Sequence, residues 1–261
     1  MTTVIVPVDF SETSLNAARY ACGLLTGHYG VSLTLYHSYA KAADESEFTD
    51  RLQLLQKELS KLFPVKIETL ATHDADFIEG LEKTARHLKA NLVIMGITGK
   101  TGLAQAFFGS NTLKMAQTKA CPVLIVPESA SFNQMSNVML ASDFKDTYNT
   151  TPSGPIKEFL SIHKPQLHVV NVDKDHYISL TEHYENEKQD MRKLLSDYDP
   201  QFYFMRIYDV DEALEMFAND RDIDLIIAIQ KHHSFMQNIF HRSKTKRLSH
   251  HSKMPILVIH E

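Results

Sequence analysis

Residues 122–128 read PVLIVPE, and residues 255–261 read PILVIHE, 133 positions later. The same offset relates NLVIM at residues 91–95 to DLIIA at residues 224–228. Self-similarity at a fixed distance along a chain indicates a structural unit that occurs more than once. The sequence therefore predicts two copies of one domain.

The beginnings of the two halves show the same relation. VDF at residues 8–10 matches SDF at residues 142–144, at an offset of 134. We place the domains at residues 1–130 and 135–261, with residues 129–134 as the connector. So short a connector keeps the halves close, and we expect them to pack on each other.

Each half alternates short apolar runs with helical patterns. The runs are rich in β-branched residues on consecutive positions, which is typical of strands covered on both faces of a parallel sheet. The first half has them at 4–8, 31–36, 65–70, 92–95 and 123–126, and the second at 138–141, 167–171, 202–207, 225–229 and 256–259. Helical spacing of apolar residues predicts helices at 14–27, 48–62 and 75–88. Five alternating strands per half predict an α/β fold.

Composition narrows the functional class. The hydrophobic fraction is 43% and the net charge is −5, which favour a globular protein and disfavour nucleic acid as the main partner. No apolar run approaches the roughly 20 residues that cross a bilayer, and the N-terminus does not resemble a signal peptide. Two cysteines cannot make a disulfide framework. We therefore expect a cytoplasmic protein without a membrane partner.

Two segments of the first half meet at the carboxyl edge of the predicted sheet, where open α/β sheets bind ligands. One is the end of the first strand, around Asp9. The other is the glycine-rich loop after the fourth strand, residues 96–111, which contains Lys100 and leads into a helix predicted at 111–118. Glycines let backbone amides approach an anion, and a helix N-terminus attracts one. The pattern indicates a phosphate cradle.

Two other interpretations of this loop remain open. The glycines would equally serve to shape turns without any ligand. Alternatively, GKT at residues 99–101 suggests a Walker A loop, but that motif needs a glycine at position 94, where the chain has Ile94. The loop also follows the fourth strand instead of the first.

A more specific resemblance rests on the full spacing of the loop. Four residues match the G-x2-G-x9-G-[ST] motif of ATP-binding universal stress proteins: Gly96, Gly99, Gly109 and Ser110. VPVDFS at residues 6–11, Met95, and CPVLIVP at residues 121–127 also resemble that family. The likeness covers the first half and, more weakly, the second. The chain is similar to a tandem universal stress protein.

The resemblance implies a fold and a ligand. Each domain would be a Rossmann-like α/β unit of the adenine nucleotide alpha hydrolase-like type. Its five-stranded parallel sheet would have the order 3-2-1-4-5, with helices on both faces. The first domain would bind ATP, ADP or AMP, and Mg²⁺ would accompany ATP.

The resemblance also assigns roles to individual residues. Asp9 would contact the adenosine part, although a carboxylate after a first strand also serves to cap a turn. Ser38 would offer a backbone contact to adenine, and Met95 would pack near the base. The glycines and the start of the next helix would surround the ribose and phosphates. The site residues implied are Pro7, Val8, Asp9, Ser38, Met95, Gly96, Gly99, Gly109, Ser110, Asn111 and Thr112.

The second half departs from the motif. Ile229, His232 and Arg242 stand where the first half has its three glycines, while Asp143 and Ser243 are the counterparts of Asp9 and Ser110. Large side chains would fill the cradle, so we expect a degenerate domain with a structural or regulatory role.

The second half has a basic, histidine-rich segment of its own at residues 231–253. A solvated helix and loop, an anion site and an imidazole metal site are all compatible with it. It lacks a recognisable metal-ligand spacing. Nucleic acid binding is disfavoured because this half carries more acidic than basic charge.

Three functional hypotheses remain. The first is an adenine-nucleotide sensor or regulator of the stress response. The second is a slow ATPase, although no catalytic constellation emerges and whether the protein is an enzyme stays open. The third is a ligand-free interaction scaffold. We further expect the fifth strands of the two halves to pair about a pseudo-twofold axis, so that one chain mimics a dimer, and a homodimer of chains is a further expectation.

Overall fold

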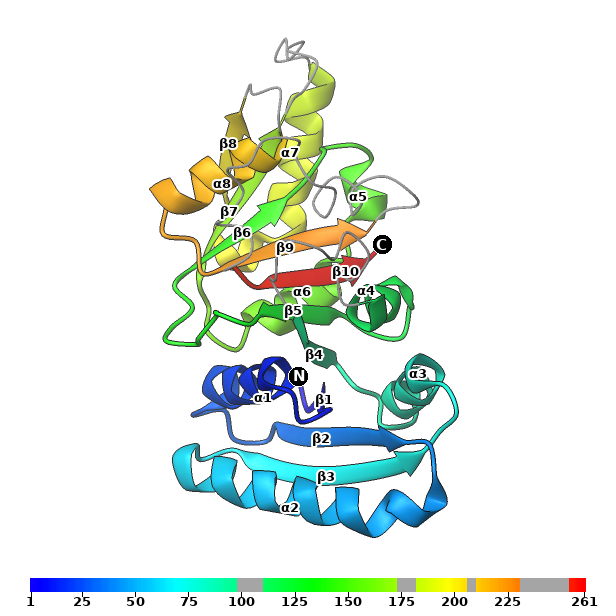
Figure 1. Ribbon diagram of the computed structural model, residues 1–261. Coiled ribbons are helices and arrows are strands. Elements are labelled where there is room, and N and C mark those ends of the chain that lie inside the picture. The colour runs from blue at the N-terminus through cyan, green and yellow to red at the C-terminus, as the bar shows by residue number, and fades with distance from the viewer. Residues whose placement is uncertain (98–109, 173–181, 206–209, 231–253) are drawn as a thin grey trace. The chain divides into compact units, whose positions relative to one another are not determined.

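The computed structural model describes residues 1–97, 110–172, 182–205, 210–230 and 254–261. The chain divides into two compact units, Met1–Asn133 and Gln134–Glu261. Each unit is an α/β domain built on one parallel sheet (Figure 1).

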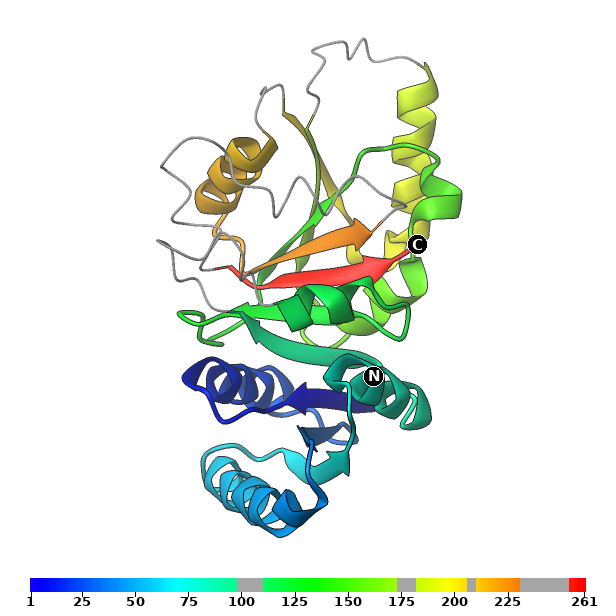
Figure 2. The same ribbon diagram turned by 45° about the vertical axis from the view of Figure 1, so that its right-hand side comes forward.

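In the first unit the five strands are parallel and follow the order β3-β2-β1-β4-β5. Helices α1 and α2 cover one face of the sheet, and α3 and α4 cover the other (Figure 2). The elements are β1 (Thr3–Pro7), α1 (Glu12–Leu25), β2 (Ser32–Tyr39), the short helix η1 (Ala42–Asp44), α2 (Glu45–Leu62), β3 (Lys66–His73), α3 (Phe77–His87), β4 (Leu92–Ile97), α4 (Ser110–Gln117) and β5 (Val123–Pro127).

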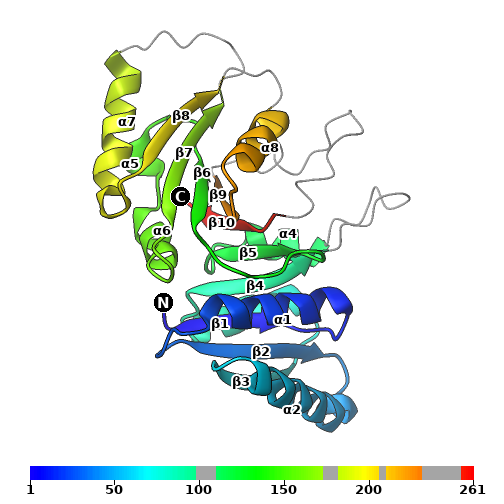
Figure 3. The same ribbon diagram turned by 90° about the vertical axis from the view of Figure 1, so that its left-hand side faces the viewer.

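In the second unit the order is β8-β7-β6-β9-β10, again with all strands parallel. Helices α5, α6 and α7 lie on one face and α8 on the other (Figure 3). The elements are β6 (Asn137–Ala141), α5 (Thr147–Thr150), α6 (Ser153–Leu160), β7 (Gln166–Val172), α7 (Glu182–Leu194), η2 (Ser196–Tyr198), β8 (Gln201–Met205), α8 (Val210–Asp220), β9 (Leu225–Gln230) and β10 (Ile256–His260).

The predicted fold class is confirmed, and both sheets have the order 3-2-1-4-5 when each unit's strands are counted from its own start. The apolar runs form the core because both faces of these sheets are covered. All four of the residues from Leu92 to Met95 in β4, for example, are buried. The prediction was less exact at strand ends: β2 and β3 run three residues past their predicted ends, to Tyr39 and His73.

The internal repeat extends to single hydrogen bonds. In the first unit the side chain of Asn91 accepts from the backbone N–H groups of Thr2 and Thr3, at 2.8 and 2.9 Å. In the second unit Asp224 accepts from Ser136 and Asn137 at 2.7 and 2.9 Å. An equivalent side chain thus ties the start of the first strand to the start of the fourth in both units.

The first helix differs between the units. In the first unit α1 is continuous over 14 residues, and Ser11 caps it by accepting from the N–H of Ser14. In the second unit its place is taken by the four-residue α5 and the eight-residue α6. Pro152 lies between them, and proline supplies no N–H for a continuous helix.

The predicted connector is held against the first unit. The side-chain amide of Asn16 donates to the carbonyl oxygens of Pro127 and Ala130, at 3.2 and 2.9 Å. Phe132 lies over Gly23, where an added Cβ would be 3.0 Å from the Cβ of Phe132. Its ring also meets Tyr20 edge to face at 5.5 Å between centroids. Helix α1 therefore fixes the start of the connector.

Candidate functional site

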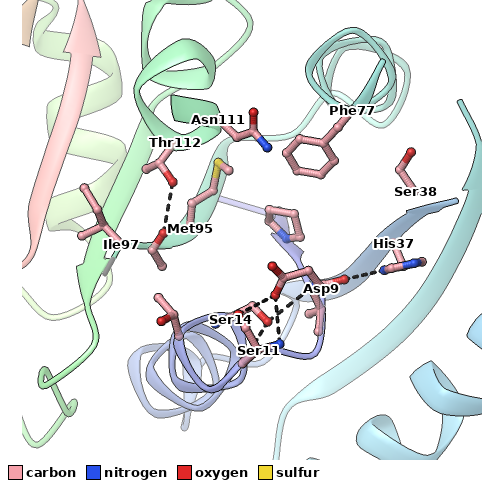
Figure 4. A pocket seen from close by; sticks show the side chains of 14 residues that line it. Asp9, Ser11, Ser14, His37, Ser38, Phe77, Met95, Ile97, Asn111 and Thr112 are labelled. Carbon is pink, nitrogen blue, oxygen red and sulfur yellow. Dashed lines mark hydrogen bonds between the residues drawn. The ribbon is translucent and has the colours of Figure 1, made fainter. Parts of the chain in front are cut away.

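The first unit has a cavity of about 490 Å³ at the carboxyl ends of β1, β2 and β4 (Figure 4). Strand order reverses direction at β1, so the cavity lies at the topological switch point of the sheet. It is lined by Pro7, Val8, Asp9, Ser11, Thr13, Ser14, His37, Ser38, Phe77, Met95, Gly96, Ile97, Asn111 and Thr112. Eight of the eleven residues that the sequence placed in the site are in this lining: Pro7, Val8, Asp9, Ser38, Met95, Gly96, Asn111 and Thr112.

Three predicted site residues are not in that lining. Gly99 and Gly109 lie outside the described residues, so the structure does not bear on their predicted contacts with phosphates. Ser110 is the first residue of α4, but its side chain also lies outside the described part of the chain. The described cavity is therefore formed by the strand ends, α1, α3 and the start of α4.

A tight turn between β1 and α1 presents Asp9 to the cavity. Phe10 has a φ of 63°, a left-handed conformation that is uncommon for a residue other than glycine. The turn brings Ser11 back to Asp9, whose Oδ1 accepts from the Ser11 N–H at 3.0 Å and from its Oγ at 2.6 Å. The Asp9 N–H donates to Ser14 Oγ at 3.3 Å. The carboxylate is thus fixed by its own turn.

These hydrogen bonds also set the charge of Asp9. Burial raises the pKa of this carboxyl, but the bonds from Ser11 and Ser14 and from backbone N–H groups outweigh burial and hold the pKa below its usual range. Asp9 is therefore ionised at neutral pH. A fixed carboxylate accepts hydrogen bonds from hydroxyl or amino groups and repels phosphate. A phosphorylated ligand would place its phosphates away from Asp9.

Gly96, near the end of β4, has a packing role in addition to the ligand role that the motif predicts. A Cβ atom on Gly96 would lie 2.5 Å from the backbone oxygen of Thr13 and 2.7 Å from its Cγ2. The glycine is needed where α1 crosses β4, because no side chain fits between them. Its backbone still lines the cavity, and its carbonyl accepts from Thr112 Oγ1 at 3.0 Å.

The bond from Thr112 holds the first turn of α4 against the end of β4. The first N–H groups of a helix have no partner within the helix, and the helix dipole makes this end attractive to anions. Asn111 and Thr112 of this turn line the cavity. The start of α4 is therefore a fitting place for a negatively charged group.

Sequence reasoning missed several residues of the site. Six lining residues are absent from the predicted set: Ser11, Thr13, Ser14, His37, Phe77 and Ile97. His37 donates from Nδ1 to the carbonyl oxygen of Val8 at 2.6 Å, which joins the ends of β2 and β1. Phe77 comes from the start of α3. It could have been found because the turn after β3 lies on the same sheet edge.

The second unit keeps the turn but changes its surroundings. Phe144 has a φ of 51°, and Asp143 Oδ1 accepts from the Lys145 N–H at 3.2 Å. Ile229, a buried residue, stands at the place of Gly96. The division of the first helix into α5 and α6 agrees with this substitution, because a helix in the position of α1 would collide with the side chain of Ile229. His232 and Arg242 lie outside the described residues.

The described residues also bear on metal binding and on the state of the two cysteines. That part of the chain holds no cluster of three histidine, cysteine, aspartate or glutamate side chains able to bind a metal ion. Burial raises the pKa of both Cys22 and Cys121 to about 12, so their thiols are protonated and unreactive. In the same part of the chain, no helix is long and apolar enough to cross a membrane.

Parallel strands in the order 3-2-1-4-5 within each unit, with a cavity at the switch point of the first unit, define a Rossmann-like α/β protein. The model of the universal stress protein family matches residues 1–127. Residues 1–127 therefore form a universal stress protein domain.

Individual relatives agree with this assignment. A universal stress protein of Methanocaldococcus jannaschii is 27% identical over 136 residues, which are 47% of this chain and 80% of the relative. One of Thermus aquaticus is 27% identical over 134 residues, 48% of this chain and 97% of the relative. The crystal structure of a universal stress protein from Archaeoglobus fulgidus has a TM-score of 0.68 at 14% identity, and the match covers 99% of this chain and 98% of that one. Because the identity is only 14%, the match to the Archaeoglobus fulgidus structure shows a shared fold and nothing about function.

Proposed function

We propose that the first unit binds an adenine nucleotide, ATP or its di- or monophosphate, in the cavity at the ends of β1, β2 and β4. The observation that carries the proposal is the polarity of this cavity. An ionised carboxylate, Asp9, faces it from the β1–α1 turn, and the start of α4 faces it from the other side (Figure 4). A ligand with hydroxyl or amino groups at one end and phosphate at the other matches both.

The size and lining of the cavity support this ligand class. Its volume of about 490 Å³ falls in the range of roughly 300–1,000 Å³ that is usual for small-molecule sites. Met95, Phe77 and Val8 supply apolar surface for a flat base. The glycine spacing at 96, 99 and 109 adds the sequence pattern of a phosphate-binding loop.

We assign the protein a regulatory role in which nucleotide occupancy of the first unit is the sensed quantity. Hydrolysis is the alternative, and it would need a positioned water and a divalent ion such as Mg²⁺ bound to the phosphates. Among the described lining residues the single carboxylate is Asp9, and Ser11 already engages its Oδ1. This geometry favours binding over turnover. A cytoplasmic location fits a nucleotide-dependent regulator and belongs to the same proposal.

The direct test is to release small molecules from the purified protein by heat and to identify them by mass spectrometry. We expect an adenine nucleotide, and isothermal titration with ATP should show binding to the nucleotide-free protein. Phosphate release under saturating ATP would favour the ATPase. If no nucleotide is released and ATP does not bind, the remaining hypothesis is the ligand-free interaction scaffold.

The pairing of the two fifth strands, β5 and β10, belongs to this proposal as a prediction of assembly. Exposed sheet edges are usually paired or covered. Because the connector packs on α1 up to Phe132, a fragment of residues 1–133 keeps those contacts. Such a fragment should self-associate in sedimentation experiments, and a stable monomer would contradict the pairing.

A further inference from the structure

Phe77 is the first residue of α3, and the start of this helix is firmly held. Asp76 caps it: its Oδ1 accepts from the N–H groups of Ile78 and Glu79, at 2.8 and 3.0 Å. Such a cap stabilises the start of a helix because it satisfies N–H groups that have no partner within the helix. The backbone that carries the Phe77 ring is therefore fixed before any ligand arrives.

The region behind the ring is also closely packed. Tyr36, fully buried in β2, lies 6.4 Å from Phe77 between ring centroids, at 47°. Its hydroxyl accepts from Thr72 Oγ1 at 2.9 Å and donates to Asp74 Oδ2 at 3.3 Å. At Gly80, an added Cβ would lie 2.6 Å from the Asp74 carboxyl. There is little room for the turn between β3 and α3 to shift.

The ring itself faces the cavity. Figure 4 shows Phe77 across the cavity from Asp9, between Asn111 and Ser38. The side chain is only half-buried, so part of its apolar surface is left to the cavity. The other ring of the described lining, His37, already packs against Phe48 with 4.1 Å between centroids. Phe77 is thus the aromatic surface available to a ligand.

We propose that the base of the bound nucleotide stacks on Phe77, so that this residue supplies the selectivity for ligands that carry a base. The proposal rests on nucleotide binding by the first unit. A rigid aromatic ring loses little conformational freedom on binding, and every nucleobase offers a π face. The ring should therefore strengthen the binding of ATP, ADP and AMP alike, and leave the binding of base-free phosphates unchanged.

The chain has no tryptophan, which permits a direct probe. In the Phe77→Trp protein the single indole would report on the cavity. We expect ATP to quench its fluorescence, because the base stacks on it, and sodium tripolyphosphate to leave it unchanged. Phe63→Trp is the matched control: Phe63 is also half-buried in the first unit but does not line the cavity. Its fluorescence should not respond to ATP.

Affinity gives the second measurement. Phe77→Leu keeps an apolar side chain without a π face, and Phe77→Ala removes the surface altogether. Loss of stacking should weaken ATP and AMP binding by about 5- to 150-fold for Ala, and by less for Leu. Phe63→Leu should bind as the unaltered protein does. Circular dichroism checks that each variant is folded.

The outcomes separate this inference from the proposed function. If the unaltered protein does not bind ATP, the proposed function fails and the stacking role fails with it. If it binds ATP, and Phe77→Leu binds equally well or Phe77→Trp binds without quenching, the stacking role alone is wrong. Should Phe77→Ala fail to fold, the Leu and Trp variants still decide.

Discussion

Replacing Gly96 by alanine should destabilise the first unit, because the added methyl group has no room. The Cβ atom would approach the Thr13 backbone oxygen to 2.5 Å, about 0.9 Å short of the 3.4 Å at which ordinary contact begins. The obstacle is main chain in α1, so no side-chain rotation relieves it. Helix α1 and strand β4 would have to move apart.

The magnitude follows from the cost of overpacking, typically about 1–3 kcal/mol for an extra methylene in a packed site. Alanine also restricts the unfolded chain, which returns about 0.4–1 kcal/mol. We expect a net loss of about 1–2 kcal/mol in the free energy of unfolding. Thr13→Ala in the same protein should restore part of it, because it removes the Cγ2 contact at 2.7 Å and leaves the backbone contact.

Urea denaturation followed by circular dichroism measures this loss, and hydrogen exchange in α1 localises it. The matched control is Gly154→Ala in α6, where an added Cβ meets nothing within 4 Å and the helix should gain about 0.5–1 kcal/mol. A Gly96→Ala protein as stable as the unaltered one would refute the packing argument. Gly96 would then be a ligand-facing glycine, as the motif alone suggests.

Three further predictions concern charge and stoichiometry. His168 is buried, and its burial and, to a smaller extent, the charge of Arg221 hold its pKa below the usual value. As the pH falls below about 6.5, His168 therefore binds a proton in the unfolded chain but not in the folded one. Stability should therefore fall with pH in this window, and His168→Gln should flatten the dependence of the melting temperature between pH 7.5 and 5.5; an equal fall in both proteins would argue against it. Asp9→Asn keeps an acceptor but loses the charge, so ATP affinity should drop by about tenfold in calorimetry, whereas tighter binding would place the phosphates beside Asp9. Equilibrium dialysis should give at most one nucleotide per chain, because the second unit lacks the glycines, and two equivalent sites would contradict this.

The positions of the strands and the repeat could be predicted because they depend on local pattern, whereas the strand order came from the family resemblance. Apolar β-branched runs mark buried strands wherever they occur, and the matching runs at 122–128 and 255–261 need no knowledge of packing. The same holds for Asp9: it directly follows a predicted strand, so its place at the carboxyl edge of the sheet follows from the fold class.

The sequence does not show which residues from distant parts of the chain each side chain contacts. Gly96 fits a ligand motif, yet its missing side chain makes room for Thr13, which lies far away in the sequence. Phe77 belongs to no motif and reaches the cavity only because α3 begins beside it. Contacts of this kind depend on how helices pack on a sheet, and they join segments whose separation along the chain carries no periodic pattern. The sequence by itself determined the positions of the strands and the sheet edge at which the cavity lies, and only the tertiary structure decided which side chains form its walls.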